Sequence, residues 1–233
     1  MTIRSKALSL SVPSVTVRTR ARAEGLWLYG YGAFQGAVAA ADSFMLFFAA
    51  GVLGASASSV GLVDAIESLG YTAGAVVIGL VMRRFSQYRA LLILLVGAVS
   101  IPLFLFSFIS TLTFAIALAA FFGFVWAPTS ILTPMVATQN VPRARWSGVL
   151  AQLSQYGALG GAAGMVVSSL WLAVSQHLAQ PEIGVRLLWV VLGGVALLAA
   201  FVVHSFLPSS PPSGPRRVSL AAASDWVSGQ GQG

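Results

Sequence analysis

The sequence contains no cysteine and only two histidines, His177 and His204. The absence of thiols excludes disulfide frameworks, cysteine nucleophiles, iron–sulfur clusters and thiolate zinc sites. Two histidines that lie far apart in the sequence do not indicate a metal centre, so we expect neither a metal nor a cofactor. The sequence also lacks Gly-x-Ser-x-Gly, His-Glu-x-x-His and Walker motifs, and we therefore do not expect an enzyme.

Charged residues are scarce as well. They make up 8% of the 233 residues, whereas 57% are hydrophobic and the mean hydropathy is +0.86. Soluble chains carry about 25% charged residues, because their surfaces must be hydrated. The sequence therefore predicts an all-α integral membrane protein.

The apolar residues form long runs that short polar segments interrupt. About 20 apolar residues in a helix cross the hydrocarbon core of a bilayer, and on that basis we expect six spans. They cover approximately 26–53, 60–82, two spans within 90–142, 146–174 and 187–207. The uncharged run 90–142 is divided by the polar residues between Ser107 and Thr113. The small residues 54–59 predict a hairpin between the first two spans.

The basic residues are distributed unevenly between the two sets of loops. Twelve of the 13 fall on one predicted side: Arg4, Lys6, Arg18, Arg20, Arg22, Arg83, Arg84, Arg89, Arg143, Arg145, Arg216 and Arg217. Only Arg186 lies on the other side. Because Lys and Arg in short loops stay in the cytoplasm, we expect both termini there, in a multi-pass protein of the cytoplasmic (inner) membrane. The net charge of +7 is then a topology signal, and we do not expect nucleic-acid binding.

Two tails flank the predicted six-helix bundle of residues 25–207. Residues 1–24 form a basic tail without the apolar core and cleavage site of a secretory signal. Residues 208–233 are rich in Pro, Ser and Gly and predict a disordered tail. Both tails are expected on the cytoplasmic side, and no second domain is expected.

One loop carries a recognisable pattern. After the second span, the chain runs from Gly79 through Arg83 and Arg84 to Arg89. In order and spacing this segment resembles the loop between helices two and three of the major facilitator superfamily, Gly-x-Leu-x-Asp-Arg-x-Gly-Arg-Arg/Lys. Gly79 and Arg84 match, and Arg89 is close to the basic end of the pattern, but Arg83 replaces the acidic residue. Segments 54–62 and 142–164 resemble the entries into helices two and five of that family.

The resemblance implies a fold and a kind of partner. Members of the family usually have twelve helices in two six-helix bundles, and each bundle contains inverted repeats of three helices. This chain resembles one such bundle, so a homodimer, a separate six-helix partner or a larger membrane complex is expected to cover its cavity-facing surface. The family's acidic loop residue stabilises one gating state. Arg83 in its place favours an alternative function, a structural or assembly subunit without transport.

Three acidic residues lie within the predicted spans. Two polar stripes with helical spacing carry them: Tyr31, Gln35 and Asp42 in the first span, and Asp64, Glu67 and Tyr71 in the second. An acid in the bilayer costs about 2.5–3.5 kcal/mol on insertion scales, so such residues are functional candidates. Because the two spans are antiparallel neighbours, we expect the three acids to share one pocket.

The predicted spans contain no basic residue that could pair with these acids. They must therefore be protonated, face water or be neutralised by a cation. This pattern favours a proton- or cation-coupled secondary transporter, with Asp42 as the first coupling candidate and Glu67 and Asp64 beside it. The alternative is that Asp64 and Glu67 are hydrated in the outer interface near the start of their helix.

Other polar residues are candidates for contact with a small-molecule substrate. Besides Tyr31, Gln35 and Tyr71, they are Trp126, Gln152 and Gln155. The glutamines can equally have a structural role, since amide side chains join neighbouring helices in membranes. The spacing Gly160-x-x-x-Gly164 predicts close packing between helices rather than a nucleotide site.

Overall fold

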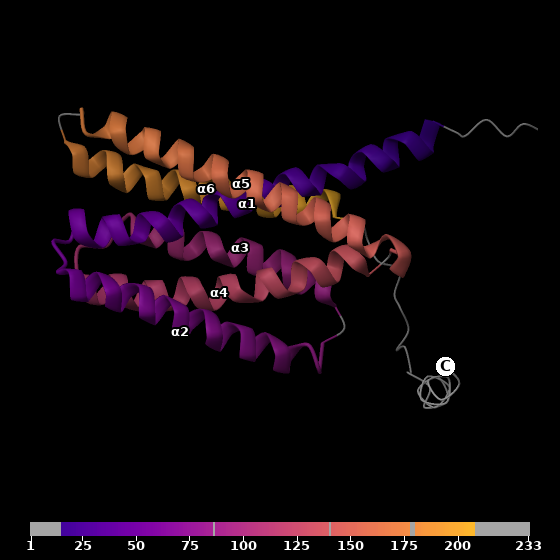
Figure 1. Cartoon of the computed structure of the whole chain (residues 1–233), viewed down its shortest axis with the longest axis horizontal. Coiled ribbons are helices and arrows are strands. Elements are labelled where there is room, and N and C mark those ends of the chain that lie inside the picture. The colour runs from indigo at the N-terminus through magenta and orange to yellow at the C-terminus, as the bar shows by residue number, and fades with distance from the viewer. Residues whose placement is uncertain (1–14, 86, 140, 178–179, 208–233) are drawn as a thin grey trace, which may run out of the picture.

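The computed structural model describes residues 15–85, 87–139, 141–177 and 180–207, and within these ranges it contains helices and no strand. Figure 1 shows the bundle from the side. The elements are α1 (Val15–Gly51), α2 (Ala57–Val81), α3 (Tyr88–Phe106), α4 (Leu112–Thr138), the short 3-10 helix η1 (Arg143–Arg145), α5 (Trp146–Ser175) and α6 (Pro181–Phe206). The six α-helices are each long and apolar enough to cross a membrane.

The helices agree with the expected spans in number and order, and α1 and α6 begin clearly before the expected bounds. Helix α1 begins at Val15, within the segment predicted as a tail. Helix α6 begins at Pro181 rather than near residue 187, because proline is favoured in the first turn of a helix. Residues 1–14 and the predicted tail 208–233 lie outside the described residues.

The predicted hairpin between the first two helices is confirmed. Gly54 has a φ of +64° in the connection, a left-handed conformation that glycine adopts without steric cost. Ser56 then caps α2, and its side chain accepts a hydrogen bond from the Ser59 backbone N–H at 3.3 Å. The ends of α1, α3 and α5 and the starts of α2, α4 and α6 lie together at one end of the bundle (Figure 1). We call the opposite end, which carries Arg83, Arg84, Arg143 and Arg145, the basic end.

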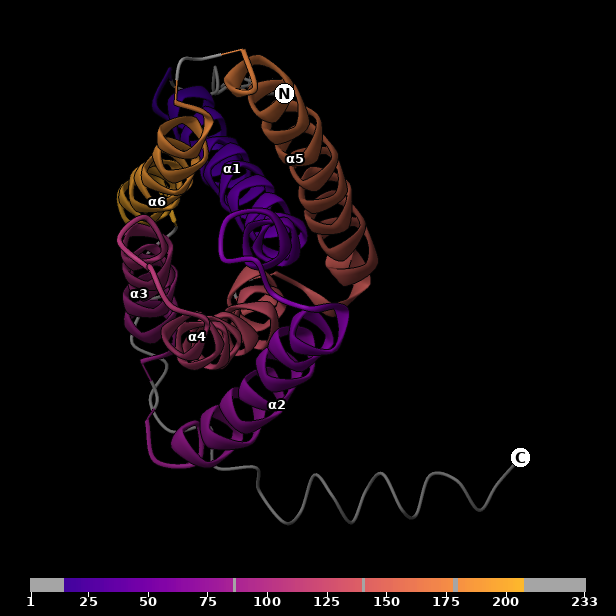
Figure 2. The same ribbon diagram turned by 90° about the vertical axis from the view of Figure 1, so that its left-hand side faces the viewer.

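Helices α1 and α4 occupy the centre of the bundle (Figure 2). Helix α1 packs against α5 and α6, α4 packs against α2 and α3, and α3 packs against α6. Large aromatic side chains fill the space between α1, α3 and α6: the Phe106 and Trp189 rings stack at 4.5 Å between centroids, and Phe48 meets the Trp189 ring edge-on at 5.8 Å. This core leaves α2 and α5 at the periphery.

Two helix crossings depend on glycine pairs. A Cβ atom on Gly160 or Gly164 of α5 would overlap the backbone carbonyls of Gly32 and Gly36 in α1. A Cβ atom on Gly70 or Gly74 of α2 would likewise overlap the carbonyls of Ala120 and Phe124 in α4. The predicted packing role of Gly160-x-x-x-Gly164 is thus confirmed, and α2 contains a second pair with the same spacing.

Two arginines join α3 and α6 reciprocally at opposite ends of the bundle. Arg89, at the start of α3, donates a hydrogen bond to the His204 carbonyl near the end of α6, at 3.2 Å. Arg186, near the start of α6, donates to the Ser107 carbonyl at the end of α3, at 2.7 Å. Carbonyls in the last turn of a helix lack helical partners, and a cation satisfies them well. Arg186 is therefore engaged in capping at the end of the bundle that otherwise has little positive charge.

Replacing Arg186 with glutamine is expected to lower the free energy of unfolding by about 1 kcal/mol, because a charge-assisted hydrogen bond to the end of α3 is lost. Thermal unfolding of the purified protein in detergent measures the change. The control is Arg83→Gln at an exposed position just beyond α2, where we expect a change below about 0.5 kcal/mol. Equal melting temperatures of Arg186→Gln and the wild type would contradict a capping role.

Candidate functional site

The three acids of α1 and α2 lie together in the structure. Glu67 is only 5% exposed, Asp42 is half-buried and Asp64 is exposed. The carboxyl groups of Asp42 and Glu67 are within hydrogen-bonding distance of each other, and Asp64 is close enough to interact with both electrostatically. We refer to Asp42, Asp64 and Glu67 as the acid cluster.

The buried position of Glu67 follows from backbone contacts. Gly123 of α4 lies against the backbone of Glu67 and Tyr71, so closely that a Cβ atom would overlap the Glu67 carbonyl. This contact draws α2 onto α4 and encloses the Glu67 side chain between α2, α4 and α1. A glycine in α4 therefore determines how deeply an acid of α2 is buried.

One carboxyl oxygen of Glu67 has no hydrogen-bond partner among the described residues. The Glu67 carboxyl group is beside that of Asp42, and a hydrogen bond between two carboxyl groups requires a proton on one of them. A buried polar atom without a partner costs about 1–3 kcal/mol. A proton or a small cation between the two carboxyl groups would offset this cost, so the cluster is suited to binding either of them.

A cluster of aromatic side chains lies one helical turn beyond Glu67, toward the basic end. The Tyr71 and Trp126 rings meet edge-on at 5.2 Å between centroids, and the Phe122 ring stacks on that of Trp126 at 5.9 Å. The Tyr71 hydroxyl is hydrogen-bonded to Ser130 at 2.8 Å. The indole N–H of Trp126 is buried and has no acceptor among the described residues. The sequence analysis missed Phe122 and Ser130, because neither residue is unusual in an apolar helix.

Tyr31 and Gln35 lie further toward the basic end on the same stripe of α1 as Asp42. The Gln35 amide donates a hydrogen bond to the Tyr31 hydroxyl at 2.9 Å. Both side chains lie close to Gly157 of α5. Since a side chain on α5 would compete for this space, Gly157 leaves room for two polar groups between α1 and α5.

The two glutamines of α5 are not part of this arrangement. Both Gln152 and Gln155 are exposed. Tyr156 and Leu159, which follow on α5, line a groove toward α6, and neither glutamine is among its lining residues. The structure therefore brings together α1, α2 and α4 residues but not the α5 glutamines that the sequence analysis grouped with them.

The residues of the α2–α3 loop have separate positions. Gly79 is exposed on α2, and Arg83 and Arg84 are exposed beyond its end. Arg89 instead reaches α6, as described above. The described residues contain no group of three or more His, Cys, Asp or Glu side chains that could hold a metal ion. The acid cluster is therefore not arranged as a three-ligand metal site, and what it offers is the close pair of carboxyl groups of Asp42 and Glu67.

Comparisons with known proteins identify no relative. No protein-family description, no curated protein and no solved structure matches the chain. The geometry of the acid cluster and its surroundings is therefore what a functional assignment rests on.

Proposed function

We propose that this chain is a half-size secondary transporter coupled to protons or another small cation, with an architecture like one bundle of the major facilitator superfamily. One observation carries the proposal: Glu67 is buried in an apolar helix bundle beside Asp42, with one carboxyl oxygen unpartnered among the described residues. Membrane proteins rarely retain such a group unless it binds or moves a cation. Tyr31, Gln35, Tyr71 and Trp126 extend polar groups from the acid cluster toward the basic end.

The packing of the helices supports an inverted repeat of α1–α3 and α4–α6. In such a repeat, α1 corresponds to α4, α2 to α5 and α3 to α6. The α1–α5 crossing then corresponds to the α4–α2 crossing, and both crossings use glycine pairs with the same spacing. The Arg89–His204 contact likewise corresponds to the Arg186–Ser107 contact. In transporters, sites for substrate and coupling ions lie near the interface between such repeats.

A partner bundle is part of the proposal. Helices α2 and α5 expose large apolar side chains, among them Leu69 and Val76 on α2 and Val166 and Leu170 on α5. In the proposed assembly, a second copy or a separate six-helix protein covers the surface around the acid cluster, and the basic end faces the cytoplasm.

Transport is tested with the protein purified together with any bound partner and reconstituted into vesicles that contain a pH-sensitive dye. The interior of the vesicles is acidified, and sodium, potassium or tetraethylammonium is then added to the outside solution. We expect one of these cations to accelerate proton efflux above that of protein-free vesicles. Glu67→Gln and Asp42→Asn should each reduce the rate of proton efflux at least about tenfold, equivalent to about 1.4 kcal/mol in the barrier. The reason is that an amide side chain does not take up and release a proton at the pH of the assay.

The control is Asp64→Asn, since Asp64 is the exposed member of the acid cluster. We expect it to retain more of the wild-type rate than Asp42→Asn. Wild-type transport that does not depend on the pH gradient would contradict proton coupling. Equal rates for wild type and Glu67→Gln would contradict the role of the buried carboxyl.

A structural or assembly subunit is the second candidate function. One observation favours it: Arg83, exposed beyond the end of α2, stands where the family pattern has an acid. Purification from native membranes distinguishes the two. A stoichiometric complex with proteins unrelated to transport, together with no cation-dependent proton flux, would favour the subunit.

A further inference from the structure

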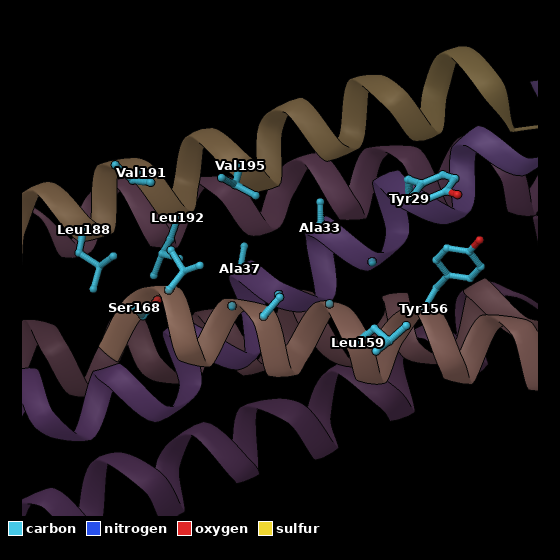
Figure 3. Close-up of a pocket in the computed structure, with 16 residues that line it drawn as sticks. Tyr29, Ala33, Ala37, Tyr156, Leu159, Ser168, Leu188, Val191, Leu192 and Val195 are labelled. Atoms are coloured by element: carbon cyan, nitrogen blue, oxygen red, sulfur yellow. The ribbon is translucent and has the colours of Figure 1, made fainter. Parts of the chain in front are cut away.

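A groove with a volume of about 470 Å³ runs along the bundle between α5 and α6. Helix α1 forms its floor with Gly32, Ala33, Gly36 and Ala37. Figure 3 shows Leu159 and Ser168 of α5 on one wall and Leu188, Val191 and Val195 of α6 on the other. The groove is separate from the acid cluster.

The groove exists because α5 and α6 pack against α1 and contact each other only slightly. The glycine pairs bring α5 close to α1, and the small residues of the floor leave the space above them unfilled. At the end away from the basic end, the Trp171 indole N–H of α5 donates to the Gly184 carbonyl of α6 at 2.8 Å. The two helices are therefore joined there and separate toward the basic end.

The polar groups of the groove lie at its two ends. Near the basic end, the rings of Tyr29 and Tyr156 meet edge-on at 5.1 Å between centroids, and both hydroxyl groups point toward that end (Figure 3). Ser168 lies near the other end. Between them the lining is aliphatic or glycine. Such a lining offers a polar solute no hydrogen bonds and favours a long apolar ligand.

The length and position of the groove restrict that ligand further. Tyr156 and Ser168 are 12 positions apart on α5, so at about 1.5 Å per residue the groove is about 18 Å long. One leaflet of hydrocarbon is about 15 Å thick, half of the whole core. Tyrosine is enriched where the hydrocarbon meets the headgroups, and here the tyrosine pair marks the end from which an acyl chain would enter.

We propose that the groove binds one acyl chain of a membrane phospholipid that belongs to the leaflet at the basic end. The tyrosine hydroxyl groups lie at the level of its ester linkages. Arg143 and Arg145, exposed in η1 at the basic end, give that end of the bundle the positive charge that favours lipids with anionic headgroups. Arg143 is held in place by Trp146, whose ring centroid is 5.8 Å from its guanidinium carbon. The site does not depend on the proposed transport activity.

A second groove provides a comparison. It has a similar volume of about 510 Å³ and lies between α3 and α4, lined by Leu105, Phe108, Ile109, Ser110, Phe114, Ala117, Leu118 and Phe121. It is at the end of the bundle opposite the basic residues and has no tyrosine pair. We therefore expect no preferential binding of an anionic phospholipid there.

The test uses the full chain in vesicles of phosphatidylethanolamine and phosphatidylglycerol, with a photoreactive group in one acyl chain of a trace of the phosphatidylglycerol. After illumination, labelled residues are identified by mass spectrometry. We expect Val191 and Val195 to be labelled at least about fivefold more than Leu198 and Phe201 on the outward face of α6, a ratio equivalent to about 1 kcal/mol of preference.

Filling the groove with Ala163→Phe should lower the labelling of Val191 and Val195 to that of Phe201. The matched control, Ala117→Phe in the second groove, should leave it unchanged. If Ala163→Phe does not fold, Ala33→Leu fills the floor with a smaller side chain and repeats the test. Uniform labelling along α6 would mean ordinary lipid contact and would overturn the proposal. So would cross-linking of the groove to a second copy or to another protein instead of lipid.

Discussion

Replacing Gly160 with valine is expected to separate α5 from α1 and to destabilise the bundle by at least about 3 kcal/mol. A Cβ atom at this position overlaps the backbone carbonyl of Gly32, and a backbone atom cannot move aside as the end of a side chain can. Because α1 also carries Asp42 and part of the core, its displacement would affect the whole molecule. Yield of monodisperse protein and thermal unfolding in detergent measure the effect.

The control for this prediction lies in the same helix. A Cβ atom on Gly148 would meet no other atom within 4 Å, so Gly148→Ala should be neutral or stabilising by up to about 1 kcal/mol through helix propensity. Gly70→Val at the α2–α4 crossing should be as harmful as Gly160→Val if the two crossings are equivalent. A Gly160→Val protein with the wild-type melting temperature would show that α5 does not depend on this contact.

Replacing Glu67 with glutamine is expected to stabilise the bundle while it reduces the proposed coupled transport. The carboxyl group is buried, and one oxygen has no partner among the residues described. The amide has nearly the same shape, removes the repulsion from Asp42 and can donate a hydrogen bond to it. We expect a gain of about 1–2 kcal/mol in the free energy of unfolding, measured by thermal unfolding in detergent.

This result would distinguish a functional acid from a structural one, since residues retained for function often reduce stability. Asp64→Asn is again the control: its exposed carboxyl should change stability by less than about 0.5 kcal/mol. A loss of stability in Glu67→Gln similar to that of a core truncation would contradict the argument. It would mean that the carboxyl group holds α1 and α2 together.

The spans were predictable from the sequence because membrane helices obey a simple length rule. The run of uncharged residues from 90 to 142 divides at the polar residues near Ser110, and the structure has its helix break there. The 54–59 turn was predictable because small residues and glycine permit its conformation. The first span, predicted at about 26–53, agrees with the apolar segment Gly25–Gly51, although α1 itself extends back to Val15, since basic residues mark the end of a span but do not end a helix.

The side-chain arrangement was predictable only within one helix. Helical spacing places Asp42 with Gln35, and Glu67 with Tyr71, on shared stripes. Spacing does not specify the rotation of a helix about its axis, so it could not show that Gln152 and Gln155, predicted to contact a substrate, are exposed. It also assigned Arg89 to a loop motif, whereas its contact is with a carbonyl of α6, 115 positions later in the sequence.

By itself, the sequence determined that the helices suit a lipid bilayer rather than water, how many helices there are, and at which end of the bundle the positive charge lies. These properties depend on hydropathy and charge, which add up along the chain without reference to tertiary contacts. Tertiary structure decided that Glu67 is buried and Asp64 is not, although they are three positions apart on one helix. The physical reason is the close approach of α4 at Gly123, a contact between residues of different helices that no local pattern records.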